Sequence, residues 1–327
     1  MLTIKKIGIL VIILFFINLQ SHAESGTEEQ SQNYHSFSLY TIAGFLYGHS
    51  EELVYRNGQN DTYLSELLWD LKPHPYIGIG VDFTPSIPGR SGLSALGNIK
   101  IGMPGISGII ENRDWLNISN YDLTHYSRHN AVTGFTILTD LSLGYSWALT
   151  EAIRFIAYGE FSYMYFSWTA RDGYYQHPST LWGDYPPWNE DLPKINSGGR
   201  VITYQQSWFM LSPGIAFNAR ISSIVSMGLG FSYSPLILCF AKDEHLLRDI
   251  IFWDIMYFGN YFNIKGNLLL SPIRNVDLNF SFSYRYINRT RGDTYIRENN
   301  RTTAYSNIVG AVFSAMDFTF AVRIPFN

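Results

Sequence analysis

Apolar and polar side chains alternate with a period of two along most of the chain. The clearest run spans residues 276–286. Its apolar and aromatic members fall on one face: Val276, Leu278, Phe280, Phe282, Tyr284 and Tyr286. The residues between them are polar. Since successive side chains of a strand point to opposite sides, the run predicts a strand with one apolar and one polar face. The same pattern recurs at 135–147, 225–234 and 316–326.

About ten such strands follow one another, and the segments between them alternate in length. Short connections are expected near 85–92, 150–152, 221–224 and 272–275. Long polar connections are expected near 49–62, 111–130, 172–199, 241–253 and 288–303. This alternation is typical of outer-membrane barrels, which have short periplasmic turns and long external loops. An even number of strands closes the sheet without a free edge in lipid. The pattern therefore predicts an all-β fold, a ten-stranded antiparallel transmembrane β-barrel with long extracellular loops.

The expected strands are longer than a bilayer requires. They contain close to ~20 residues each, whereas ~9–11 tilted residues cross the hydrocarbon core. We therefore expect the barrel to project above the membrane surface.

The N-terminus has the features of a secretory signal peptide. Lys5 and Lys6 form a positive region, residues 7–19 are apolar, and 21–23 (Ser-His-Ala) fit a small-x-small cleavage site. The alternative is an uncleaved anchor helix, but the apolar run is shorter than the ~20 residues that a span needs. We expect a signal peptide at residues 1–23 and a barrel at 24–327.

Composition supports a membrane barrel over other β-folds. Aromatic residues make up 16% of the chain, charged residues only 15%, and the mean hydropathy is -0.03. A barrel with one face in lipid and one in water has this balance. The competing architecture, a soluble β-sandwich or propeller, needs no signal peptide and would not place so many aromatic residues on one strand face. The net charge of -4 gives no reason to expect nucleic-acid binding. The single cysteine, Cys239, lies in an apolar run and is expected to be a packed residue.

Two acidic clusters could carry chemistry. Residues 111–115 end the expected third strand and 242–245 end the expected seventh. Odd-numbered strands run outward if the N-terminus is periplasmic, so both clusters should lie at the extracellular rim. Asp243 and His245 share a strand face, so the carboxylate can orient the imidazole as a base. Asp114 is expected to approach across the barrel mouth, where the two sides would activate a water molecule.

A metal site is the other interpretation of these residues. Asp243, Glu244 and His245 lack the H-E-x-x-H spacing of zinc proteases, and the remaining histidines are scattered along the chain. We therefore expect neither a metal nor another cofactor.

Several short motifs make the chain resemble the omptin family of bacterial outer-membrane aspartyl-type proteases, as a divergent member. They are residues 48–55 (GHSEELVY), 64–69 (LSELLW), 112–115 (NRDW), 127–129 (SRH), 169–173 (TARDG) and 243–245 (DEH). Their joint order spans nearly the whole mature chain. The resemblance implies a surface endopeptidase in the bacterial outer membrane, whose site faces outward and acts on proteins or peptides.

The resemblance also implies the catalytic residues. Omptins hold a water molecule between an Asp–His pair and a pair of acids. The Asp–His pair corresponds to Asp243 and His245, and the acid pair to Asn112 and Asp114. Asn112 offers no negative charge and cannot take a proton, so we expect reduced activity. Glu111 is adjacent, but strand alternation turns it to the other face unless a bulge intervenes.

The substrate pocket departs from the family further. The resemblance places Glu52, Ala241 and His125 at positions that bind substrate, and only the first is acidic. We therefore expect neutral or mixed specificity rather than a preference for basic residues.

The lipid site of the family is not retained either. At the positions that bind lipopolysaccharide in omptins this chain has Phe161, Tyr163, Tyr165 and Ser207, which lack the charges that pair with phosphates. We expect no requirement for that lipid. Two other functions stay open: a catalytically weak omptin-like adhesin or binding protein, and an unrelated porin-like or lipid-handling barrel.

Overall fold

The computed structural model describes residues 35–56, 62–85, 89–117, 121–178, 185–273 and 276–326. The expected signal peptide, residues 1–23, lies outside these ranges. Residues His35–Asn327 form one compact unit. The described residues contain no helix with the length and hydropathy needed to cross a bilayer.

The described part of the chain consists of β-strands. In chain order they are β1 (His35–Tyr55), β2 (Tyr63–Pro85), β3 (Gly92–Gly102), β4 (Gly105–Asp114), β5 (His125–Thr133), β6 (Thr136–Ala148), β7 (Ile153–Gln176), β8 (Ile195–Asn196), β9 (Arg200–Arg220), β10 (Val225–Ser234), β11 (Ile237–His245), β12 (Ile250–Tyr257), β13 (Tyr261–Ile273), β14 (Val276–Ile287), β15 (Arg291–Glu298) and β16 (Arg301–Phe326).

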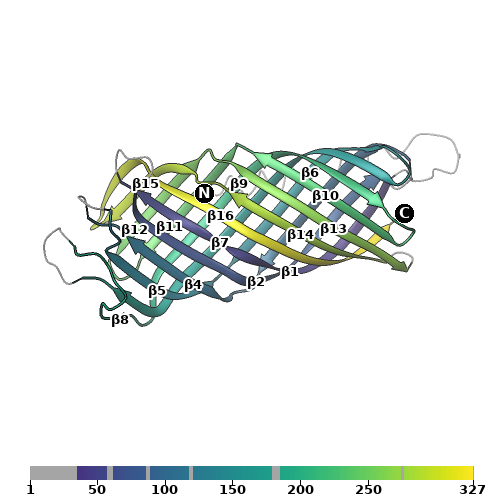
Figure 1. The fold of residues 1–327 in the computed structure, drawn as a ribbon. Helices are drawn as coiled ribbons and strands as arrows, with labels where there is room; N and C mark the ends of the chain where they lie inside the picture. The colour runs from purple at the N-terminus through teal and green to yellow at the C-terminus, as the bar shows by residue number, and fades with distance from the viewer. Residues whose placement is uncertain are drawn as a thin grey trace. The chain divides into compact units, whose positions relative to one another are not determined.

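These strands form a closed antiparallel barrel with ten positions around its wall (Figure 1). Five strands, β1, β2, β7, β9 and β16, run along its whole length. The other five positions are each divided into two shorter strands: β3 with β4, β6 with β5, β10 with β11, β13 with β12, and β14 with β15. β16 pairs with β1 and closes the ring. The expected ten-stranded barrel is confirmed, and half of its strands are interrupted partway up.

The strand ends agree with the four expected short turns, of which residues 86–88 and 274–275 lie outside the described ranges. The strands extend further into the expected long loops. β1 continues to Tyr55, for example, and β15 and β16 form a hairpin across the expected loop at 288–303. In these stretches both faces of the wall carry polar residues, so alternation of polarity stops while strand pairing continues. The sequence pattern therefore underestimated the height of the wall.

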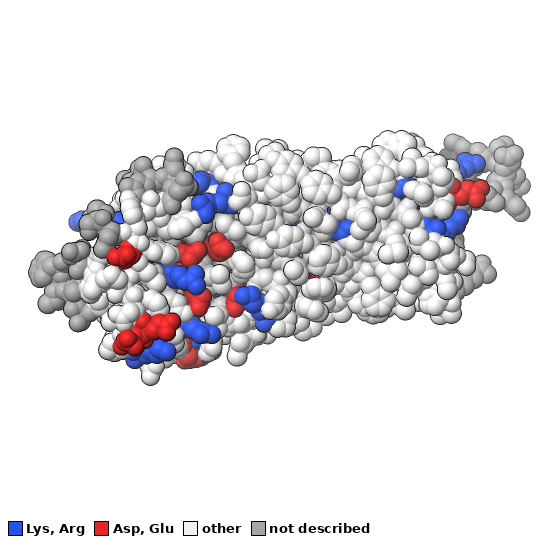
Figure 2. All heavy atoms as spheres, in the orientation of Figure 1, with Lys and Arg blue, Asp and Glu red and all other residues white. Residues whose placement is uncertain are grey.

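An apolar belt surrounds one part of the barrel, and charged side chains lie beyond it. On the face shown in Figure 2, few charges lie in the middle and most gather at the end that carries β12 and β15. β7 contains 24 residues, which at about 3.3 Å each would extend roughly 80 Å. This is far more than the bilayer core requires. The wall therefore extends beyond the apolar belt, as the strand lengths predicted.

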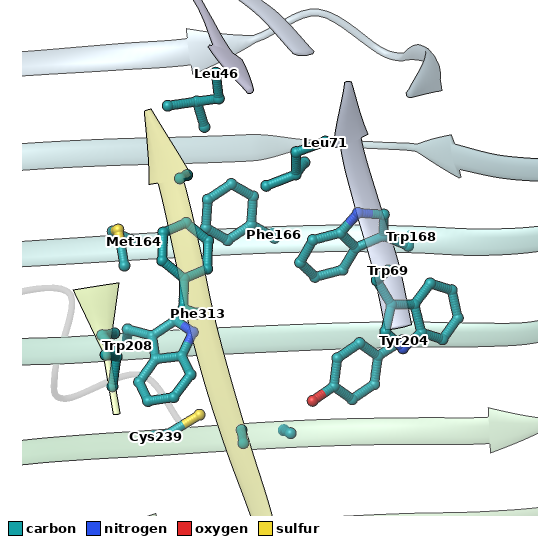
Figure 3. Packing of buried hydrophobic residues seen from close by; sticks show 14 of the residues in the cluster. Leu46, Trp69, Leu71, Met164, Phe166, Trp168, Tyr204, Trp208, Cys239 and Phe313 are labelled. Carbon is teal, nitrogen blue, oxygen red and sulfur yellow. The ribbon is translucent and has the colours of Figure 1, made fainter. Parts of the chain in front are cut away.

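The barrel interior has two zones with an aromatic layer between them. Along β7, inward side chains change from Glu160 and Ser162 to Met164, Phe166 and Trp168. Figure 3 shows this layer, in which the Trp69 ring stacks on Tyr204 at 5.2 Å between centroids. On one side of the layer lies a polar cavity of about 490 Å³.

Ion pairs hold the walls of that polar cavity together. Arg285 donates to both carboxylate oxygens of Asp140, at 3.1 and 2.7 Å. The Lys100 ammonium lies 2.7 Å from Asp317. All four residues are buried. The other side of the aromatic layer faces the end where both acidic clusters lie.

Candidate active site

The end of β4 presents two of the expected site residues to the barrel interior. Register places Asp114 between Ser65 on β2 and His125 on β5. The Ser65 hydroxyl lies 2.6 Å from Asp114 Oδ1 and 3.2 Å from Asn112 Oδ1. Asn112 Nδ2 lies 3.4 Å from Asp114 Oδ2. Ser65 therefore links Asn112 and Asp114, the two residues that we expected from the family resemblance at the acid pair.

The surroundings of Asp114 act on its pKa in opposite directions. Burial raises the pKa of this carboxyl. The Ser65 hydroxyl and the nearby positive groups, including Arg248, partly oppose that rise. Without the Ser65 hydrogen bond, Asp114 would hold its proton to higher pH.

The second pair lies at the end of β11 and is joined by a hydrogen bond. His245 Nε2 lies 2.7 Å from Asp243 Oδ2. Asp243 is buried, whereas the His245 side chain is partly exposed and contacts Phe252 edge-on. With Nε2 protonated, this ring donates to Asp243 and directs Nδ1 elsewhere. The expected contact between the two side chains on one strand face is present.

Asn112, Asp114 and His245 line one cavity of about 310 Å³. β4 and β11 are far apart in the sequence and are not paired in the sheet. Barrel closure therefore brings the two groups to opposite sides of one space, as the alternation predicted. A cavity of this size admits several water molecules or a segment of peptide.

Glu111 takes no part in this cavity. It accepts hydrogen bonds from Arg113 at 2.8 Å and from the Tyr126 hydroxyl at 2.7 Å. The irregularity in β4 pairing lies between Ile106 and Gly108, below this position. No bulge therefore turns Glu111 inward to replace the acid missing at Asn112.

The three expected substrate-binding residues occupy two different places. His125 lines the cavity, where its ring stacks on His177 with centroids 5.5 Å apart. Burial lowers the pKa of His125. Glu52 and Ala241 are 4% and 5% exposed and do not line the cavity.

Asp254, which the sequence did not single out, lies beside those two residues. It is the cross-strand partner of Ala241. Burial raises its pKa to about 7, and burial together with Asp243 and Asp254 raises that of Glu52 well above its usual range. Glu52 and Asp254 lie beyond the apolar belt, because the outer face of the wall carries charged residues here, among them Glu51 and Lys242. The Asp254 carboxyl therefore lies next to Ala241, a position without an acid, but it is buried.

Four of the eight histidines, which are scattered in the sequence, lie around the cavity. His125, His129, His177 and His245 all line it. Among the described residues, however, no three His, Cys, Asp or Glu side chains are arranged to hold a metal ion.

Ser65 and Arg248 are the other functional candidates that sequence reasoning missed. Ser65 lies in one of the motifs quoted for the family, and strand alternation alone would have placed it on the inner face. Arg248 lies in the turn that follows His245, where no periodic pattern indicates the direction of a side chain.

Three of the four positions expected at a lipid site, Phe161, Tyr163 and Tyr165, carry aromatic rings, and the fourth is Ser207. Phe161 is exposed, and the Tyr163 ring lies 4.9 Å from Phe209. Ser207 pairs with Tyr165 across β7 and β9. This arrangement resembles the rest of the apolar belt.

The closed antiparallel barrel, with its aromatic layer between two cavities, defines the class of membrane β-barrels. The sequence matches the model of the Omptin family over residues 33–327, and the chain belongs to this family. Comparison with the curated proteins gave no match.

Among solved structures, the fold is similar to outer membrane protease OmpT from Escherichia coli. The two share 20% sequence identity with a TM-score of 0.80, over 92% of this chain and 100% of that one. Toluene transporter TodX from Pseudomonas putida also matches, at 8% identity and a TM-score of 0.33, over 90% of each chain. The attachment invasion locus protein Ail from Yersinia pestis matches at 10% identity and a TM-score of 0.26, over 88% of this chain and 98% of that one. These last two scores are too low to support a functional comparison.

Proposed function

We propose that this chain is an outer-membrane endopeptidase that hydrolyses peptide bonds in the cavity between β4 and β11. One observation carries the proposal: His245, oriented by Asp243, lies across a single cavity from Asn112 and Asp114. Membership of the omptin family and the fold shared with an outer membrane protease support it.

The reaction needs a base, a water molecule and a polar wall. In our proposal His245 Nδ1 removes a proton from water, while Nε2–H stays donated to Asp243. The hydroxide adds to the peptide carbonyl. The tetrahedral intermediate then collapses, and His245 returns the proton to the departing amine. Asp243 stabilises the imidazolium that forms in between.

Asp114 and Asn112 would position the water from the opposite side. The Asp114 carboxylate accepts a hydrogen bond from it, and Asn112 contributes an amide rather than a second charge. We expect slower catalysis than with two acids, because one electrostatic contribution to the transition state is missing.

The cavity would face the extracellular side. It opens at the end of the barrel opposite the short turns and the strand termini at His35 and Phe326. Outer-membrane barrels place short turns in the periplasm. Protein or peptide substrates would then approach from outside the cell, and neutral or mixed specificity fits the loss of acid at Ala241 and His125. The aromatic wall at Phe161 and Tyr163 fits a protein that does not require lipopolysaccharide.

A second candidate is a surface adhesin or binding protein on the same scaffold. The observation that favours it is Asn112, which removes one member of the acid pair. In this case the cavity would bind a peptide without cutting it.

Cleavage of a diverse peptide library by the refolded, full-length barrel in detergent separates the two candidates. His245→Ala and Asp114→Ala serve as inactive controls, and Glu111→Ala, whose side chain faces away from the cavity, serves as a matched control. An endopeptidase would lose at least ~10³-fold of its activity in the first variant. Equal cleavage by the parent and both inactive controls would show that the assigned site is wrong, and no cleavage by folded parent would favour the binding protein. Parallel assays with and without lipopolysaccharide test the lipid requirement.

A further inference from the structure

The turn after His245 places a cation inside the proposed site. The Arg248 amide donates to the His245 carbonyl at 3.1 Å, and Asp249 adopts a left-handed conformation with φ of 53°. This turn directs the Arg248 side chain back over β11. Its guanidinium contacts His245 Nδ1 and lines the cavity with Asp114.

That contact occupies the atom that would act as the base. A guanidinium is a donor only, so His245 Nδ1 must be the acceptor. The other ring nitrogen, Nε2, is already engaged with Asp243 at 2.7 Å. A water molecule therefore finds no free lone pair on His245 while Arg248 is in place.

Arg248 is also a cation without a carboxylate partner among the described residues. Asp114 is close enough for Arg248 to influence its pKa, but the two form no ion pair in the structure. The cavity wall otherwise carries imidazoles, from His125, His129 and His177. The buried acids Glu52 and Asp254 do not line this space. Among the described residues that line the cavity, Arg248 is therefore the cation and Asp114 the carboxylate, and the Arg248 guanidinium is not held by an ion pair.

We propose that the cavity binds a carboxylate of the peptide substrate beside the scissile bond, and that Arg248 is its counter-ion and releases His245 on binding it. The inference rests on the proposed function and names its substrate class: peptides with an acidic side chain next to the cleaved bond. Arg248 is a positioning residue, because it acts on the reaction through His245.

Guanidinium chemistry explains why a carboxylate can make this exchange. Arginine and carboxylate form two parallel charge-assisted hydrogen bonds, which are stronger than a single bond to a neutral imidazole. The Arg248 side chain is exposed and can change rotamer without disturbing the wall. The substrate would thus remove the block on the base only when it is in position.

The test compares peptides that carry Glu, Gln or Lys at one position next to the mapped scissile bond and are otherwise identical. All peptides are amidated at the C-terminus, and one further Gln peptide has a free C-terminal carboxylate. We expect the Glu peptide to exceed the Gln peptide by about tenfold in kcat/KM, which corresponds to about 1.4 kcal/mol. The Glu peptide should have a lower KM than the Gln peptide. It should also have a higher kcat, because its binding releases His245.

Substitution of Arg248 should change the order of the substrates. Arg248→Gln should remove the difference between Glu and Gln, and Arg248→Glu should make Lys the preferred residue. Arg297→Glu is the matched control, because Arg297 is an exposed arginine at the same end that stacks on Trp253 outside the cavity. That variant should keep the parental order.

A binding arm keeps the inference separate from the catalytic proposal. Fluorescent Glu, Gln and Lys peptides are titrated into His245→Ala and into His245→Ala combined with Arg248→Glu. Tighter binding of Glu in the first and of Lys in the second would support the inference even if the parent cleaves nothing. Equal binding of all three, a preference for Lys in the parent, or an effect confined to KM would overturn it. A preference for the free C-terminal carboxylate alone would contradict an acidic side chain as the ligand.

Discussion

Ala241 on β11 and Asp254 on β12 are direct cross-strand partners, and the Asp254 carboxyl is buried beside Glu52. Burial and the charges of Asp243 and Asp254 raise the pKa of Glu52, and burial and the charge of Asp243 raise that of Asp254. A carboxyl is therefore present on β12, directly across the strand pair from Ala241. This relationship has consequences for stability that can be measured without knowing the substrate.

Asp254→Asn should remove a pH dependence of stability. The pKa of Asp254 in the fold is about 7, above its usual value, so the native state binds more protons than the unfolded chain between about pH 4 and 7. Stability from this group is full at low pH and falls as pH rises through that window, by on the order of 4 kcal/mol. The variant should therefore unfold at a higher temperature than the parent at pH 8. Thermal unfolding followed by circular dichroism in detergent measures this, with exposed Asp191→Asn as a control. Identical profiles for parent and Asp254→Asn would contradict the argument.

Asn112→Asp should increase peptide cleavage. A second carboxyl next to Asp114 would add negative charge opposite His245 and restore the electrostatic contribution that the amide lacks. We expect a gain of about tenfold or more in kcat, measured with the best peptide from the library. Glu111→Gln, on the opposite face of the same strand, should leave kcat unchanged. A lower kcat in Asn112→Asp would mean that the amide itself holds the water.

Ser65→Ala should move the acidic limb of the pH–activity profile upward. The Ser65 hydroxyl lies 2.6 Å from Asp114 and lowers its pKa, while burial raises it. Removal of that hydrogen bond lets the acid hold its proton to higher pH, so activity that needs the carboxylate should be lost sooner on acidification. A shift of about one pH unit is expected for one hydrogen bond to a charged group. Ser65→Thr, which keeps the hydroxyl, should restore the parental profile, and an unmoved limb in Ser65→Ala would exclude Asp114 as the group that titrates.

Asp140→Asn should destabilise the lower half of the barrel. It leaves the buried Arg285 guanidinium without its bidentate partner and with only Asp317, at 4.0 Å, as a carboxylate neighbour. Removal of one partner of a buried ion pair typically costs about 3–5 kcal/mol. The double variant Asp140→Asn with Arg285→Met should recover much of that loss, because no unpaired charge remains. The unfolding temperature of the three proteins in detergent gives the comparison. If the double variant is no more stable than Asp140→Asn alone, the unpaired charge is not the cause.

The sequence by itself determined the barrel. Strict alternation at 276–286 and 316–326 requires a sheet with one apolar and one polar face, and alternating connection lengths give its up-and-down order. The same periodicity placed Asp243 and His245 on one face and Glu111 on the other, since a strand has only two faces. Where both faces carry polar residues, as in β15, polarity carries no periodicity, and the strands could not be recognised.

Tertiary structure alone decided which residues meet across the barrel mouth. The register of the wall set Asp254 beside Ala241 and Ser65 beside Asp114, and closure of the ring set His245 across the cavity from Asn112. The turn that returns Arg248 to His245 depends on a left-handed residue at Asp249 rather than on any periodic pattern. Side chains of different strands become neighbours only through pairing register and closure, because no local sequence pattern specifies contacts across more than one hundred residues.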